Sequence, residues 1–207
     1  DKGANLTTPA TKGITVALSD TLSWQYGFGS PDTVASFYGM TIPLVEKGIP
    51  VKIMPLENIK AAADLEDTKI LMLSYDSQKP TSALYNQAIA QWVRDGGVLL
   101  YIGSYDPFND MNLWWKEAGF NSPYEHLLNE LGISGQVTAG KLTSGNEVNT
   151  IEWQINDGNS YGEGVEIPKS YSISKFTGNI QPLFKSGNDV VAYEKQIGRG
   201  HFIDIGI

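Results

Sequence analysis

Two short apolar runs separated by a helical segment constrain the fold of this chain more than any other feature. Residues 69–74 read KILMLS and residues 97–103 read GVLLYIG. Neither run alternates apolar and polar residues, which is typical of strands that are covered on both faces. The amphipathic segment between them carries Leu84, Ala88, Trp92 and Val93 at helical spacing. This order predicts a parallel β-α-β unit at the centre of an open sheet.

The rest of the chain extends this unit. Further strands are expected at 14–18 and 50–54, and helices from Pro31 to Gly48, where Pro43 should kink or split the helix, at 56–65, from Pro80 to Gly96, from Asp106 and at 122–131. Strands at 136–142, 150–155, 166–176 and 190–195 and a closing hairpin strand at 201–205 follow. The predicted fold class is α/β, a flavodoxin-like three-layer sandwich with a central, mostly parallel sheet that is extended by C-terminal antiparallel strands.

The domain organisation follows from the same pattern. Residues 1–12 are polar and without a period, which predicts a linker or a disordered N-terminus. Residues 13–207 form one expected domain, with a parallel α/β part at 13–133 and a β-rich completion of the same sheet at 134–207. The chain begins at Asp1 without a methionine and stops on an apolar strand, so we expect it to be a piece of a longer protein.

Composition excludes several classes of function. A net charge of −8 argues against a nucleic-acid partner, and no apolar run is long enough for a membrane span. The chain has no cysteine, which excludes disulfides, thiolate metal sites and a cysteine nucleophile. Absence of free thiols suits export, and we expect a secreted or periplasmic protein.

Function in an open α/β sheet is expected at the carboxyl ends of its strands. Both central strands end there in the same triplet, Ser-Tyr-Asp. The candidate ligand-binding residues of this predicted rim are Asp20, Trp24, Gln25, Tyr75, Asp76, Ser104, Tyr105 and Asp106. Their carboxylates can accept sugar hydroxyls or bind a cation, and their aromatic faces suit sugar rings or a protein interface. The alternative is that the acids are helix caps and the rings are core.

The sequence also contains candidates for a catalytic serine and for a metal site. Ser104 stands where a nucleophile could follow a strand, with His126 or His201 as its base, but the Gly-x-Ser-x-Gly context is missing, and a turn serine explains it as well. Asp106, Asn109 and Asp110 offer closely spaced oxygen ligands without the rest of a calcium loop. No cofactor is expected.

Several segments together resemble a known superfamily. VEKGIPV at 45–51, KILMLS at 69–74, IAQWVRDGGVLLYIG at 89–103 and GRGHFIDIG at 198–206 are similar to the class I glutamine amidotransferase-like superfamily. Within it, residues 14–207 most resemble non-catalytic domains of bacterial glycoside hydrolases, such as the trimerisation domain of family 42 β-galactosidases. Active amidotransferases place a cysteine after the fourth strand, backed by a histidine and an acid. Gly103-Ser104-Tyr105-Asp106 stands at that turn here, so the resemblance implies a domain kept for binding or assembly.

The sequence therefore predicts a non-catalytic amidotransferase-like domain of a larger secreted carbohydrate-active protein, serving assembly or the shaping of an active site. Its expected partners are other domains of the same chain or further copies of itself. The first alternative is a domain that binds carbohydrate or another small molecule at the strand-end rim. The second alternative is a hydrolase that uses Ser104 or the rim carboxylates.

Overall fold

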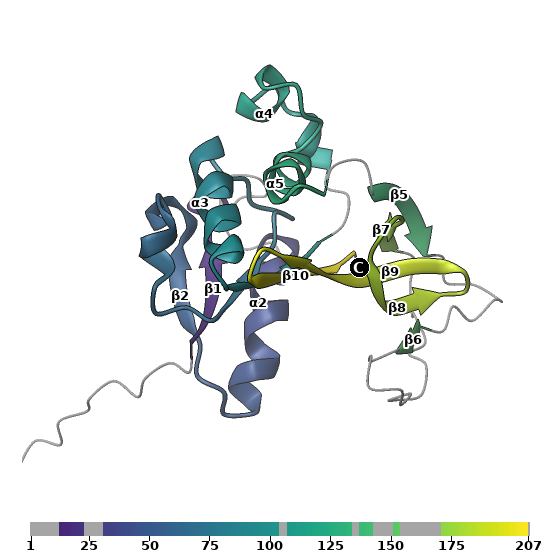
Figure 1. Ribbon diagram of the computed structural model, residues 1–207, viewed down its shortest axis with the longest axis horizontal. Coiled ribbons are helices and arrows are strands. Elements are labelled where there is room, and N and C mark those ends of the chain that lie inside the picture. Colours follow the sequence, from purple (N-terminus) through teal and green to yellow (C-terminus); the bar gives the residue numbers. More distant parts are fainter. Residues whose placement is uncertain are drawn as a thin grey trace, which may run out of the picture.

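A computed structural model describes residues 13–22, 31–103, 107–133, 137–142, 151–153 and 171–206 (Figure 1). The strands are β1 (Ile14–Leu18), β2 (Lys52–Pro55), β3 (Ile70–Leu73), β4 (Val98–Ile102), β5 (Val137–Leu142), β6 (Ile151–Trp153), β7 (Tyr171–Phe176), β8 (Gln181–Ser186), β9 (Asp189–Ile197) and β10 (Gly200–Ile205). The α-helices are α2 (Pro31–Glu46), α3 (Ala83–Arg94), α4 (Trp114–Glu117) and α5 (Pro123–Leu131). Three 3-10 turns are η1 (Leu56–Asn58), η2 (Ala62–Leu65) and η3 (Pro107–Asp110).

One sheet runs through the described part of the chain, in the order β2-β1-β3-β4-β10-β9-β7-β5, with β8 on β9 and β6 on β8. Strands β2, β1, β3, β4 and β10 are mutually parallel. From β10 onward every pairing is antiparallel. The strand β10 therefore joins a parallel half to an antiparallel half, which confirms the predicted fold class and the predicted hairpin.

The parallel half has a layer on each face of the sheet. Helices α3 and α5 cover one face, where the main core includes Leu71, Leu99 and Phe202 from the strands and Ile89 and Leu127 from the helices. Helix α2 covers the other face, with Phe37, Met40 and Leu44 against Val16 and Met72. Figure 1 shows α3 and α5 on the opposite side of the sheet from α2. No helix in the described residues is long and apolar enough to cross a membrane.

Helix α5 has the start and the end that its sequence predicts. The Ser122 side chain accepts a hydrogen bond from the Glu125 amide at 3.0 Å, and Gly132 ends the helix with φ of 76°. Pro123 occupies the first helical position, where its missing N–H costs nothing. Local sequence signals are therefore sufficient to set both ends of this helix.

Three expectations about helices need correction. Of the two alternatives for Pro43, the split is wrong, because α2 continues as one helix to Glu46, and the kink stays a prediction. Pro43 is exposed, while Leu44 beside it packs against the sheet. Residues 56–65 form two 3-10 turns instead of a helix, because the Asp64 carboxylate accepts hydrogen bonds from the Lys60 and Ala61 amides and holds the chain in a turn. These bonds also lower the pKa of Asp64.

The other corrections concern α3 and the antiparallel half. Helix α3 begins at Ala83 behind the cap Ser82, and Leu84 lies exposed at the margin of its buried face, whereas Trp92 is buried as expected. Strand β8 is not among the predicted strands, because its Pro182 and its irregular pairing with β9 near Phe184 break a simple strand pattern.

Two glycine-rich turns that carry the family resemblance pack against each other. Any β-carbon on Gly200 would collide with the carbonyl oxygens of Val93 and Gly97, and the His201 amide donates to the Gly97 oxygen at 3.1 Å. The indole of Trp92 covers Gly97 so closely that a side chain there would overlap it. These two turns therefore pack β10 closely against β4.

Candidate functional site

The carboxyl ends of β1 and β3 carry a polar network that closes this part of the sheet edge. The Ser19 amide donates to Gln78 Oε1 at 2.7 Å, and the Ser19 hydroxyl donates to Glu57 Oε1 at 2.6 Å. The Thr21 hydroxyl donates to the Lys79 carbonyl at 2.8 Å and accepts from the Lys79 amide at 2.7 Å. Five residues from three separate segments therefore meet at the carboxyl ends of β1 and β3.

Residues 77–79 hold this network in place from the β3 side. Ser77 has φ of 60°, a left-handed conformation that is uncommon outside glycine. The two residues after it turn inward: Gln78 is 0% exposed and Lys79 3%. Gln78 donates to the Ser74 carbonyl at 2.8 Å, and the Lys79 ammonium donates to the Tyr75 carbonyl at 2.7 Å. The rim between β1 and β3 is thus filled by the chain itself.

A second set of polar contacts joins β3 to α3 and α5. The Tyr75 hydroxyl donates to Asn86 Oδ1, and the Asn86 amide donates to the Pro123 carbonyl at 2.8 Å and to His126 Nδ1 at 3.0 Å. Since Nδ1 accepts, the neutral His126 ring carries its proton on Nε2, which lies 3.4 Å from the Glu130 carboxylate. Burial lowers the pKa of His126, and Glu130 partly opposes this. Tyr75 therefore links the end of β3 to α3 through Asn86, and His126 links α3 to α5.

A buried carboxyl group on β10 is the most perturbed acid in the described structure. Asp204 is fully buried, and the Tyr124 hydroxyl donates to its Oδ2. Tyr193 is the cross-strand partner of Asp204, and burial, then the charge of Asp204, raises the pKa of Tyr193. The Tyr193 hydroxyl and Asp204 Oδ1 nevertheless have no hydrogen bond of ordinary geometry. Burial raises the pKa of Asp204 from 3.8 to about 8, and the two tyrosines oppose this rise. Asp204 is therefore mostly protonated near neutral pH.

Tyr101 connects this carboxyl group to the rim. Its ring stacks on Tyr124 with centroids 4.5 Å apart, and burial, then Asp76, then Asp204 raise its pKa well above the usual range. A β-carbon on Gly103 would lie 3.2 Å from Asp76 Oδ1 and 3.3 Å from the Tyr101 hydroxyl. Two acids and three phenols thus gather at the ends of β3, β4 and β10, which we call the tyrosine–carboxyl cluster: Asp76, Tyr101, Tyr124, Tyr193 and Asp204.

Only one member of this cluster, Asp76, is among the site residues predicted from the sequence. The signal for Asp204 was present in the alternation of β10, where Phe202 points into the core and the residue two further on must do the same. An acid at such a position needs partners. No sequence spacing indicated that Tyr124 and Tyr193 would supply them, because they come from α5 and β9.

The predicted rim is only partly described. Asp20 is exposed and its amide donates to Glu57 Oε1 at 3.2 Å; Tyr75 is buried and Asp76 half-buried. Trp24, Gln25, Ser104, Tyr105 and Asp106 lie outside the described residues. The binding site proposed from sequence, and any catalytic role of Ser104, therefore stay predictions.

The remaining candidates lie apart from this edge. His201 pairs with Val98 at the amino end of β4, opposite to the end that leads into Gly103, and His201 Nδ1 lies 2.6 Å from the Glu194 carboxylate. The backbone carbonyl of Asn109 accepts a hydrogen bond from the Trp115 indole at 2.9 Å, and the Asp110 carboxylate lies 3.8 Å from the Lys116 ammonium. Among the described residues, no three acids or histidines gather as metal ligands.

The two adjacent tryptophans differ in burial. Trp115 is fully buried. Trp114 is half-buried, stands edge-on to His126 and donates its indole N–H to the Pro80 carbonyl at 2.7 Å. Trp114 therefore links α4 to α5 and to the segment before α3, whereas Trp115 donates its indole N–H to η3.

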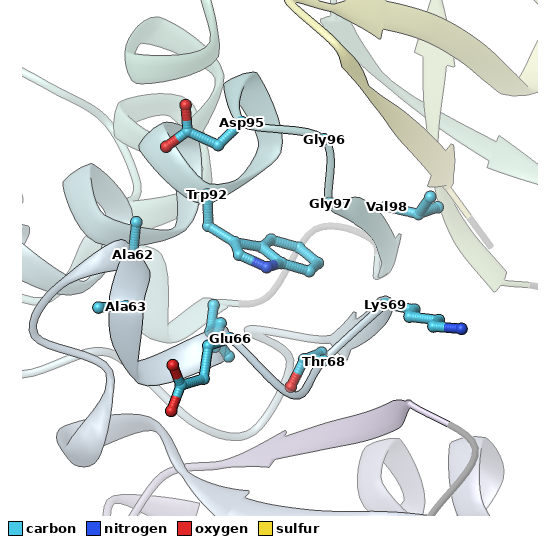
Figure 2. A pocket seen from close by; sticks show the side chains of 11 residues that line it. Ala62, Ala63, Glu66, Thr68, Lys69, Trp92, Asp95, Gly96, Gly97 and Val98 are labelled. Carbon is cyan, nitrogen blue, oxygen red and sulfur yellow. The ribbon is translucent and has the colours of Figure 1, made fainter.

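A shallow pocket of about 570 Å³ lies at the opposite, amino edge of β3 and β4. Figure 2 shows the Trp92 indole facing this space, with Ala62 and Ala63 on one side and Val98 on the other. The carboxylates of Glu66 and Asp95 stand at its margin. Asp95 is already engaged, because its carboxylate accepts from Gln91 at 3.1 Å and lies 3.8 Å from Arg199.

The elements and their order define an open α/β sheet of the flavodoxin-like class, in which Gln78 and Lys79 are buried at the carboxyl ends of β1 and β3. No family of known sequences matches the chain, and no curated protein matches it.

Solved structures share this fold. A β-galactosidase from Bacillus circulans sp. alkalophilus aligns with a TM-score of 0.63 and 13% identity over 95% of this chain and 28% of its own. A catalytic mutant of Gan42B, a GH42 β-galactosidase from G. stearothermophilus, aligns with a TM-score of 0.58 and 15% identity over 94% of this chain and 27% of its own. A cytoplasmic protein from Salmonella typhimurium aligns with a TM-score of 0.56 and 11% identity over 93% of this chain and 87% of its own.

The chain therefore spans little more than a quarter of the β-galactosidases that it matches, and at these identities the likeness is one of fold. The sequence suggested a relationship to a part of GH42 β-galactosidases, and the similarity in fold supports it. Membership of the amidotransferase-like superfamily stays a prediction.

Proposed function

We propose that this chain is a non-catalytic α/β module of a larger secreted or periplasmic carbohydrate-active protein, in which it serves assembly or shapes a neighbouring active site. The observation that carries the proposal is the filling of the sheet edge by Gln78 and Lys79, which are buried at the ends of β1 and β3. A rim occupied by its own side chains suits a scaffold better than a ligand site.

Two further observations support this proposal. The fold corresponds to about 28% of a β-galactosidase chain, the proportion expected of one module among several. The chain contains no cysteine, so the nucleophile of the resembling amidotransferases has no counterpart. Its partners would be other modules of the same polypeptide or further copies of this chain.

The reading frame that encodes the chain provides the first test. We expect it to encode a glycoside hydrolase module in the same polypeptide. Deleting residues 13–207 from that polypeptide should change its assembly or its activity while the hydrolase module stays folded, as monitored by circular dichroism and by hydrolysis of aryl glycosides. A frame that encodes no further module would contradict the proposal.

A ligand screen separates the proposal from its alternatives. A sugar that binds the folded state must raise the unfolding temperature, because binding to the native state alone stabilises it. We expect no saturable shift with galactose, lactose or other mono- and disaccharides, and no hydrolysis of aryl glycosides by this chain alone. A saturable shift that is lost in Asp76→Asn would favour a binding module, and turnover that is lost in Ser104→Ala would favour a hydrolase.

A further inference from the structure

The side-chain amide of Asn86 on α3 is fully buried and fixed in one orientation. Its nitrogen donates to the Pro123 carbonyl at 2.8 Å, and a carbonyl oxygen can only accept, so the nitrogen and the oxygen of this amide cannot exchange places. Its oxygen accepts from the Tyr75 hydroxyl. The same nitrogen lies 3.0 Å from His126 Nδ1 on α5 and faces it as a donor. His126 must therefore present a lone pair at Nδ1, which only the neutral ring has.

Protonation of His126 would place two donors face to face. A proton that Nδ1 takes from water removes the acceptor of the Asn86 hydrogen bond. Asn86 cannot turn its oxygen toward the new N–H without losing its contacts with Tyr75 and Pro123, which are both buried. The contact between α3 and α5 therefore has no second arrangement that suits a charged ring.

The surroundings of the imidazole also disfavour its charged form. His126 is 5% exposed, and the rings of Trp114 and Phe120 stand edge-on to it with centroids 5.0 and 4.9 Å away. Glu130 on the same helix places its carboxylate 3.4 Å from Nε2, and Arg94 on α3 donates to the Glu130 carbonyl, so an anion and a cation both lie nearby. Burial lowers the pKa of His126 below its ordinary value of 6.5, and Glu130 partly opposes this.

We propose that His126 is an acid switch between α3 and α5, which holds α5 in place while its ring is neutral and releases the helix when the ring is protonated. The inference concerns a property of the fold and does not rest on the proposed function. Release would uncover the buried face of α5, formed by Leu127, Leu128 and Leu131. Because the pKa of His126 is lower in the folded chain than in the unfolded chain, the stability that the neutral ring confers is complete above about pH 6.5 and is lost as the pH falls below it.

Other titrating groups on α5 act differently. Tyr124 joins the helix to Asp204, and acidification stabilises the fold through that acid, because the pKa of Asp204 is raised to about 8. The Glu125 carboxylate accepts from the Asn121 amide at 2.6 Å, and a glutamate of ordinary pKa stays ionised above about pH 5. A difference between the parent and a His126 variant, taken above this pH, therefore isolates the histidine.

Hydrogen exchange read by mass spectrometry at about pH 7 and about pH 5, corrected for the intrinsic exchange rate, tests the switch. In the parent, we expect the amides of residues 123–131 to exchange at least about fivefold faster at the lower pH, the effect of losing one buried hydrogen bond, while those of residues 98–102 in β4 change little. His126→Asn keeps a side-chain acceptor but cannot be protonated, so it should lose this response. His201→Asn, at the other histidine of the chain, should keep it.

Nuclear magnetic resonance of the histidine rings gives a second readout, which needs no variant of His126 that folds. The chain has two histidines, so His201→Asn assigns both sets of signals. We expect His126 to carry its proton on Nε2 at about pH 7 and to become protonated in the same pH range in which α5 loses its protection. Glu130→Gln removes a carboxylate that favours the charged ring, so it should move the titration of His126 to lower pH.

Three results would each overturn the proposal: exchange in α5 that does not accelerate at about pH 5, an acid response that persists in a folded His126→Asn, or a neutral His126 ring that carries its proton on Nδ1. The reading-frame test of the proposed function is independent of all three. A chain without the switch whose parent polypeptide contains a hydrolase module would keep the module assignment.

Discussion

The carboxyl group of Asp204 accepts a hydrogen bond from the hydroxyl of Tyr124, and Asp204 is fully closed to solvent. The acid comes from the last described strand and the phenol from α5, 80 residues earlier in the chain. This contact fixes the helical layer to the strand that joins the two halves of the sheet. It also makes the stability of the fold depend on a proton.

Replacing Asp204 by Asn should remove a pH dependence of stability. The pKa of Asp204 is raised from 3.8 to about 8 in the folded state, so the folded chain favours the protonated acid. The stability that this confers is complete below the ordinary value of 3.8 and is lost as the pH rises toward about 8, on the order of 6 kcal/mol at most. Asp204→Asn cannot ionise, so it should be more stable than the parent above about pH 8 and similar to it near about pH 4.

Urea unfolding at several pH values in this window measures the difference. Asp67→Asn, at an exposed acid, serves as the matched control and should follow the parent. If the difference in unfolding free energy between Asp204→Asn and the parent stays constant across the window, the assignment of a raised Asp204 pKa is wrong.

Tyr124→Phe should destabilise the fold most at high pH. It removes the donor to Asp204 Oδ2 and leaves a buried oxygen without a partner, a loss of about 1–3 kcal/mol. The hydrogen bond from Tyr124 lowers the pKa of Asp204, so its removal should extend the pH-dependent loss of stability to higher pH. The same urea titration measures both effects. Tyr38→Phe, whose ring is about half exposed, should be nearly neutral, and equal effects of the two variants would count against the contact.

Gln78→Ala should destabilise the closed rim. Gln78 accepts from the Ser19 amide and donates to the Ser74 carbonyl, and all three residues are buried. Truncation leaves two buried backbone groups without partners, at a cost of about 1–3 kcal/mol each. Gln91→Ala, at an exposed glutamine on α3, should change stability by less than about 0.5 kcal/mol. Chemical unfolding compares the two variants, and a neutral Gln78→Ala would show that the rim is open to water.

Gly97→Ala should cost about 1–3 kcal/mol through overpacking, because its β-carbon would overlap the buried Trp92 indole. Gly39→Ala provides the opposite control. A β-carbon on Gly39 meets nothing, so alanine should stabilise α2 by about 0.5–1 kcal/mol. Thermal unfolding of both variants at low protein concentration measures the contrast, which equal shifts would contradict.

The sequence was sufficient to predict the parts of the fold that local patterns control. Strand β4 and the start of α5 match their predictions because an apolar run and a Ser-Pro cap act over a few residues. The 3-10 turns of residues 56–65 and the strand β8 were missed. Hydrogen bonds from two backbone amides to the Asp64 carboxylate decide the turns, and an irregular pairing with β9 decides the strand. Neither leaves a periodic pattern.

The candidate site was predicted less well than the fold, for a related reason. The position of the rim follows from strand direction alone, and Asp76 lies there. The residues that contact these positions come from distant segments. Glu57 in η1 accepts a hydrogen bond from Ser19, and Tyr193 on β9 lies beside Asp204. Such contacts between distant residues depend on tertiary packing, and the spacing of residues along the sequence does not indicate them.

The position of β10 has a consequence for how the protein is made. This strand comes last among those described, yet it lies between β4 and β9 in the middle of the sheet. During translation, β4 must therefore remain an unpaired edge, with its backbone donors and acceptors open to other chains, until residues 200–205 have left the ribosome. A nascent chain that stalls before this point carries an unpaired strand edge that can pair with other chains. Chaperone binding to the nascent chain should therefore decrease once β10 is inserted.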